Sequence, residues 1–87
     1  MGFNKNGGKQ TMTIAFILVD SEVGKIKSTL EQIKQTKGVK EAYSIAGEKD
    51  IIVKVESEDF QGTAEAVTKN IHKINGVKDT VTFFAFE

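Results

Sequence analysis

A repeat with a spacing of 38 residues constrains the fold of this 87-residue chain more than any other feature. The segment Gly-Val-Lys-Glu at 38–41 returns as Gly-Val-Lys-Asp at 76–79, and the same offset places Ile33 on Ile71. Two strand–helix–strand units at such a spacing are typical of the split βαβ, or ferredoxin-like, arrangement. The repeat therefore predicts one α+β domain with the element order β-α-β-β-α-β.

The pattern of apolar residues supports this order in both halves of the chain. The first helix is expected to begin after a cap at Asp20 or Ser21 and to end at Gly38. Alternating apolar residues predict a hairpin around the turn 47–50, and a second helix is expected to start at Asp59. The expected strands are 13–19, 39–46, 51–56 and 77–86.

The expected architecture is a ferredoxin-like βαββαβ sandwich, with a four-stranded, overall antiparallel sheet and two helices on one face. Residues 1–12 show no periodicity and are interpreted as a flexible head, and residues 13–87 form the domain. Right-handed crossovers lead us to expect the first and third strands as a parallel pair in the centre, with the second and fourth at the edges.

One face of such a sheet has no helix to cover it, and apolar residues are predicted to lie there. The last strand is apolar on both sides, because Val81, Phe83 and Ala85 alternate with aromatic residues. A large exposed apolar patch is rare on a monomer, so we predict a homo-oligomer. The residues predicted for the dimer interface are Ile14, Phe16, Leu18, Phe84 and Phe86.

The composition narrows the classes of partner and cofactor. Twelve basic residues balance twelve acidic ones, so no global field attracts DNA or an anionic membrane. The chain has no cysteine, which excludes disulfides and thiolate metal sites, and its single His72 cannot form a histidine cluster. The longest apolar run, 14–19, is too short to span a bilayer. We expect a soluble cytoplasmic protein without a metal or cofactor.

No catalytic residues are predicted, and we expect a binding protein rather than an enzyme. His72 falls on the side of the second helix away from the apolar stripe, where a solvated role outranks that of a general base. The turn 47–50 is a better candidate for a binding site. Gly47 there can expose backbone N–H groups to a carboxylate, and Asp50 can hold an ammonium group, although both residues also suit an ordinary turn.

Three segments in this order resemble one known family. They are TKGVK followed by AYSIAGEKDIIVKVE, and INGVKDTVTFF near the end of the chain. Together they are similar to the effector domain of the Lrp/AsnC, or feast/famine, transcriptional regulators, and the resemblance covers 13–87. It implies a ferredoxin-like domain that dimerises through its sheets, forms octamers or similar rings, and binds amino acids between dimers near a Gly-x-x-Asp turn.

The resemblance also implies site residues and partners. Matched position by position, the ligand-binding residues are Tyr43, Gly47, Glu48, Asp50 and Thr82. Ala46 and Lys49 stand where the family commonly has a threonine and an aromatic residue. The family carries an N-terminal helix-turn-helix, which twelve residues cannot form. We therefore expect a stand-alone sensing domain without direct DNA binding, and full-length regulators are candidate partners.

The sequence is also compatible with two other functions. A small dimeric α/β-barrel enzyme of the monooxygenase kind shares the fold and the dimer mode. It would require a polar residue or histidine in the cavity between helix and sheet, which the sequence does not indicate. The other alternative is a purely structural oligomerisation module without a ligand.

Overall fold

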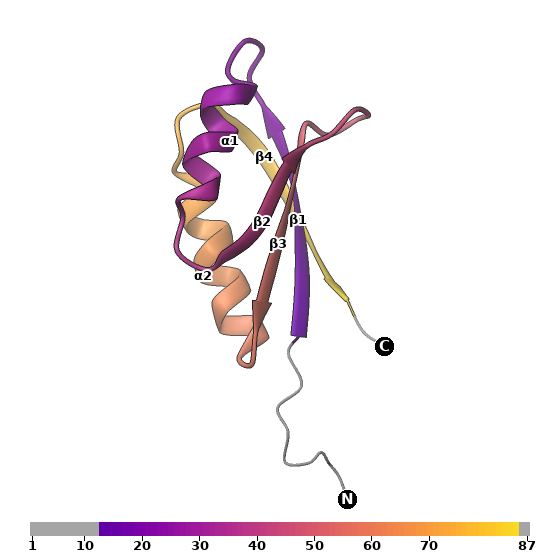
Figure 1. The fold of residues 1–87 in the computed structure, drawn as a ribbon, viewed down its shortest axis with the longest axis vertical. Helices are drawn as coiled ribbons and strands as arrows, with labels where there is room; N and C mark the ends of the chain where they lie inside the picture. Colours follow the sequence, from indigo (N-terminus) through magenta and orange to yellow (C-terminus); the bar gives the residue numbers. More distant parts are fainter. Residues whose placement is uncertain (1–12, 86–87) are drawn as a thin grey trace, which may run out of the picture.

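The computed structural model describes residues 13–85, and for Phe60 and Gln61 only the backbone. The predicted head at 1–12 and the interface residue Phe86 lie outside the described residues. The element order β-α-β-β-α-β is confirmed (Figure 1). The elements are β1 (Thr13–Ser21), α1 (Ile26–Lys34), β2 (Val39–Ser44), β3 (Ile51–Ser57), α2 (Phe60–His72) and β4 (Val77–Ala85).

The four strands form one antiparallel sheet in the order β2-β3-β1-β4, with both helices on the same side (Figure 1). The strand positions follow the prediction, but the expected parallel central pair is wrong, because β1 and β3 are antiparallel. The crossover from β1 to β2 does return the chain in its original direction, but it leaves one strand position empty between them. The strand β3 fills this position and runs antiparallel to both neighbours.

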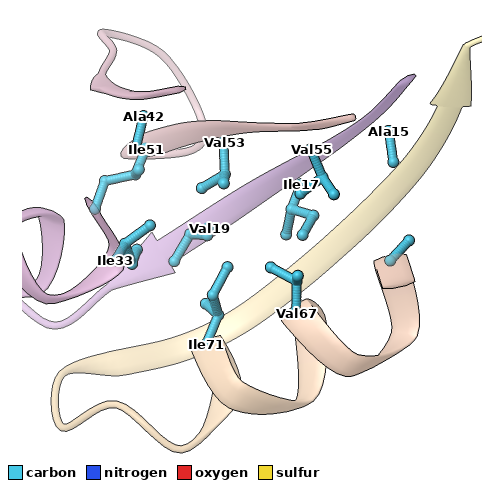
Figure 2. Close-up of a cluster of buried hydrophobic side chains, with 11 residues drawn as sticks. Ala15, Ile17, Val19, Ile33, Ala42, Ile51, Val53, Val55, Val67 and Ile71 are labelled. Atoms are coloured by element: carbon cyan, nitrogen blue, oxygen red, sulfur yellow. The ribbon is translucent and has the colours of Figure 1, made fainter. Parts of the chain in front are cut away.

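The core lies between the helices and the inner face of the sheet (Figure 2). Strict alternation in β1 and β3 places every second side chain on this face, as the polar residues of β3 predicted. The helices contribute aliphatic side chains at helical spacing. The buried residues are Ala15, Ile17, Val19, Ile33, Ala42, Ile51, Val53, Val55, Ala64, Val67 and Ile71.

The two repeated glycines pack the halves of the domain against each other. Gly38 follows α1 and has φ +96°, and a Cβ there would lie 2.6 Å from Val67 of α2. Gly76 follows α2 and has φ +106°, and a Cβ there would collide with the hydroxyl of Thr29 in α1. Each glycine thus permits a left-handed turn and a close approach to the other half's helix. This reciprocal contact explains why the repeat contains glycine.

The beginning of α1 differs from the prediction. We expected Asp20 or Ser21 to cap the helix, but β1 continues to Ser21 and α1 begins only at Ile26. Both residues instead pair with β4, across an irregularity in the register. The extra ladder bonds outcompete a local cap, and a turn containing Gly24 at φ +83° then connects the strand to the helix. Within 13–85 no helix is long and apolar enough to cross a membrane.

The open face of the sheet carries an apolar strip along β1 and β4. The antiparallel register sets Phe16 opposite Phe83, and Leu18 opposite Val81. Directly opposed residues share a face, so Val81 and Phe83 belong to this strip, and their side chains are 36% and 53% exposed. Phe84 does not share the open face with the other predicted interface residues that the structure describes. Phe84 is opposite Ala15, on the inner face, and packs against the core.

Candidate ligand-binding site

The turn 47–50, predicted to bind a ligand, joins β2 to β3 at the end of the sheet where β1 finishes (Figure 1). Asp50 ties the turn to that strand. Its Oδ2 accepts a hydrogen bond of 2.8 Å from the backbone N–H of Ser21, and its own N–H donates to the carbonyl of Val19 at 2.9 Å. One carboxylate oxygen therefore has a structural partner 29 residues earlier in the sequence. This structural role was not evident from the sequence, and a ligand role for Asp50 stays a prediction.

The rest of the turn is more open to solvent. Gly47 and Glu48 are exposed, and a Cβ on Gly47 would meet no atom within 4 Å. Lys49 reaches back to β1, where its Nζ lies 3.5 Å from Oδ2 of Asp20. The turn is thus held to β1 by an ion pair and by backbone and carboxylate hydrogen bonds, and its tip is left accessible.

Tyr43 lies on the edge strand β2, next to Ile52 of β3 and on the open side of the sheet. Its hydroxyl donates a hydrogen bond of 2.8 Å to Oε1 of Glu41. This bond and the negative charge of Glu41 raise the pKa of Tyr43 above its usual value. Tyr43 is well exposed and could contact a bound molecule or a neighbouring subunit.

Thr82 lies far from these residues within one chain. It is on β4, the opposite edge strand, and pairs with the buried Ile17, so its side chain faces the helices. Its hydroxyl lies 3.1 Å from the hydroxyl of Thr68 in α2. The structure therefore brings Gly47, Glu48 and Asp50 together but leaves Thr82 at a separate place.

A cavity of about 490 Å³ lies at Thr82, between α2 and β4. Its inner part contains the buried Ala64 and the half-buried Phe84, Thr68 and Thr82, whereas the charged side chains of its rim are exposed. The volume is within the range of small-molecule sites, about 300–1,000 Å³. The lining residues are Ala64, Glu65, Thr68, Lys69, His72, Thr80, Thr82 and Phe84.

Sequence reasoning found only Thr82 among these lining residues. The interpretation of His72 as a solvated residue agrees with its exposure, but it missed that His72 borders a cavity. A signal was present, since Glu65, Lys69 and His72 recur at helical spacing and Thr80, Thr82 and Phe84 alternate along one strand. The two patterns come from separate elements, however, and only the packing of α2 on β4 shows that they face each other.

The comparison with known families is decisive at this point. A family model described as "Lrp/AsnC ligand binding domain" matches residues 14–87. This chain belongs to the Lrp/AsnC ligand-binding domain family. The resemblance inferred from the sequence is thereby confirmed, and so is the ferredoxin-like fold of this Lrp/AsnC domain.

Proteins similar to this Lrp/AsnC domain include longer transcriptional regulators and solved structures of about its own size. An uncharacterised HTH-type transcriptional regulator of Pyrococcus furiosus is 36% identical over 77 residues, which cover 85% of this chain and 51% of the regulator. The chain thus spans about half the length of the regulators it matches. A hypothetical protein from Pyrococcus horikoshii, solved by crystallography, is 35% identical with a TM-score of 0.73, covering 86% of this chain and 90% of that chain.

A more distant structure shares only the fold. It is a transcriptional regulator from Neisseria meningitidis, described as a complex with L-Met, with 16% identity and a TM-score of 0.73. The comparison covers 100% of this chain and 58% of the regulator.

Removing the Asp50 carboxylate should destabilise the Lrp/AsnC domain. Asp50→Ala deletes a hydrogen bond from a charged acceptor and leaves the Ser21 N–H without that partner, at a cost of about 1.5 kcal/mol in the free energy of unfolding. Asp50→Asn keeps an acceptor oxygen and should cost less. Urea unfolding measures both. Glu48→Ala in the same exposed turn is the control and should change stability by less than about 0.5 kcal/mol. Equal effects of Asp50→Ala and Glu48→Ala would contradict the structural role.

Proposed function

We propose that this chain is an oligomeric sensing domain for a small metabolite, namely an amino acid, and that it acts in transcription regulation. Membership of the Lrp/AsnC ligand-binding family supports the sensing role. The names of its relatives, which are HTH-type transcriptional regulators, support the link to transcription. Assembly with full-length regulators of the family is part of the proposal.

The observation that carries the proposal is the cavity between α2 and β4. It contains Thr82, the residue that the family resemblance assigned to ligand binding from the last strand. Glu65 and Lys69 border it one helical turn apart, so a carboxylate and an ammonium group stand side by side at its rim. An amino acid carries the two complementary charges. The L-Met complex of the distant Neisseria regulator is consistent with this ligand class.

The turn 47–50 can share this site only in an assembly. Within one chain the turn joins β2 to β3 at one edge of the sheet, whereas Thr82 is on β4 at the opposite edge, beside the middle of β1. A second subunit could bring its turn, with the exposed Gly47 and Glu48, to the mouth of the first subunit's cavity. This arrangement would bring the predicted ligand residues of the turn and Thr82 into one site, and it makes ligand binding depend on oligomerisation.

The enzyme alternative receives less support. It required a histidine or another polar residue in the cavity between helix and sheet, and the lining does include Thr68, Thr82 and His72. The two threonine hydroxyls lie 3.1 Å apart and bond to each other. His72 is nevertheless exposed at the rim rather than enclosed. The regulator names of the relatives indicate a regulatory rather than an enzymatic role.

Calorimetric titration with the twenty amino acids tests the proposal. We expect at least one to bind with a Kd below the millimolar range, and Thr82→Val to weaken that binding about tenfold by removing a hydroxyl from the cavity. Thr36→Val is the matched control, because it removes a hydrogen-bonded hydroxyl from the turn after α1, outside the cavity. If no amino acid binds, or if the two variants behave alike, the proposed site is wrong.

A further inference from the structure

The turn between α2 and β4 contains the dipeptide Asn75–Gly76. Asn75 is exposed, and its Oδ1 accepts a hydrogen bond of 3.2 Å from Nζ of Lys25, the residue before α1. Gly76 takes part in the turn through its carbonyl oxygen, which accepts from the N–H of Glu22 at 2.8 Å. Among the hydrogen bonds of residues 13–85, none uses the N–H of Gly76. This nitrogen therefore adjoins the carboxamide of Asn75 without being held by another acceptor.

An asparagine that precedes a glycine can react with its own main chain. The nitrogen of the following residue and the side-chain Cγ are close enough to form a five-membered ring, so the attack is intramolecular. A side chain on the following residue hinders this approach, and glycine has none. The hydrogen bond from Lys25 withdraws electron density from Cγ of Asn75 and stabilises the negative charge that develops on Oδ1 during the attack. Nucleophile, electrophile and activating cation thus meet in one turn.

The fold itself requires the glycine of this pair. Gly76 has φ +106°, and a Cβ there would collide with a buried side chain of α1. The first half of the repeat meets the same requirement at Gly38, but Lys37 precedes that glycine and offers no carboxamide. Asn70 lies inside α2, where helical hydrogen bonding occupies the N–H of the next residue. Of the asparagines in 13–85, the structure therefore leaves Asn75 open to this reaction.

We propose that Asn75 is a site of spontaneous covalent modification, with water as the co-reactant. The main-chain nitrogen of Gly76 attacks Cγ of Asn75 and forms an N–Cγ bond. The Cγ–Nδ2 bond breaks, and ammonia leaves with the former amide proton. Water then opens the resulting succinimide at either of its two carbonyl groups. One opening gives aspartate, and the other gives isoaspartate, in which the main chain passes through the side-chain carbons and is longer by one atom.

Isoaspartate at this position would disturb the contact between the two halves of the domain. The main-chain oxygen of Asn75 accepts from Oγ1 of Thr29 at 3.5 Å, and Gly76 packs against the same side chain. A longer main chain between these two residues shifts both contacts. Aspartate keeps the main chain and only adds a carboxylate near Lys25, which already pairs with Glu22 at 3.6 Å. The isoaspartyl form is therefore the less stable product.

Peptide mapping by mass spectrometry tests the site. The intact, folded chain is incubated in mildly alkaline buffer for the time in which half of the urea-unfolded chain becomes modified at Asn75. We expect conversion of the carboxamide to a carboxylate at Asn75, an isoaspartyl product that an isoaspartyl methyltransferase labels, and an unchanged Asn70. Asn75→Gln should give no product, because glutamine would have to close a larger ring. If Asn75 of the folded chain is as intact as Asn70 at that time, the proposal is overturned.

Lys25→Met tests the activating role of the ammonium group. Methionine keeps an aliphatic stem beside Gly76 and removes the charge, so modification of Asn75 should slow about threefold. Lys27→Met removes an exposed charge from α1 and is the matched control, which should leave the rate unchanged. An unchanged or faster reaction in Lys25→Met would overturn the role assigned to Lys25.

Urea unfolding of the incubated protein tests the structural consequence. The incubated wild type should unfold at a lower urea concentration than incubated Asn75→Gln, which cannot form the product. It should also unfold at a lower concentration than Asn75→Asp, which carries the new charge on an unchanged main chain. If the incubated wild type and Asn75→Asp are equally stable, the disturbance assigned to the longer main chain is wrong.

Discussion

Phe16→Glu is expected to convert the proposed oligomer into a folded monomer. Phe16 lies in the middle of the open face, between Phe83 of β4 and Lys54 of β3. In an assembly that buries this face, the new carboxylate would be a buried charge, and the neighbouring Lys54 is already paired with Glu56 at 3.3 Å. Its cost of about 3 kcal/mol or more corresponds to at least a hundredfold increase in the dimer Kd. Within the monomer the same carboxylate lies beside Lys54 and stays hydrated, so the fold should persist.

Light scattering at micromolar concentration measures the oligomeric state, and circular dichroism measures whether the variant is folded. The matched control is Val23→Glu, which introduces the same charge at a side chain that is 99% exposed, in the turn before α1. That variant should remain a dimer or larger. A wild-type chain that is already a stable monomer of 9.5 kDa would contradict the assembly, and with it the idea that two subunits complete the ligand site.

Gly76→Ala is expected to destabilise the domain by about 3 kcal/mol. A side chain at φ +106° costs about 1–2 kcal/mol, and overpacking of a tight interior contact adds about 1–3 kcal/mol. The contact here is with Thr29, which is fully buried, so its side chain has no free space to move into. Urea unfolding of the wild type and the variant gives the difference directly.

Two further variants separate the cost of the positive φ from the cost of the steric clash with Thr29. Gly24→Ala has a similar backbone conformation, with φ +83°, but an added Cβ there meets no atom within 4 Å, so it should cost only about 1 kcal/mol. Thr29→Ala combined with Gly76→Ala removes the colliding hydroxyl and should cost less than the sum of the two single changes. If Gly24→Ala and Gly76→Ala lower the free energy of unfolding equally, the steric clash with Thr29 contributes nothing to the cost of Gly76→Ala.

Local patterns were sufficient for the elements and the inner face of the sheet. The 38-residue repeat indicated the turn after each helix, because a left-handed turn against a neighbouring helix requires glycine in each half. The helices themselves end earlier than expected, α1 at Lys34 rather than at Gly38 and α2 at His72. The alternation in β1 and β3 identified the buried side chains, since a strand turns every second residue to the same face. Motif order indicated the Lrp/AsnC family. All these signals are contained in short stretches of sequence.

Tertiary structure decided which of these stretches meet. Phe84 lies on the inner face because β4 pairs with β1 in one register, and a shift by a single residue would have reversed it. Asp50 holds the N–H of Ser21, and Thr82 meets Thr68, through contacts between segments that no local pattern connects. The cavity between α2 and β4 exists only once the helix has packed on the sheet. The sequence by itself thus determined the elements and the family of this protein, whereas pairing and packing determined the position of its candidate site, because the energy of such contacts depends on residues far apart along the chain.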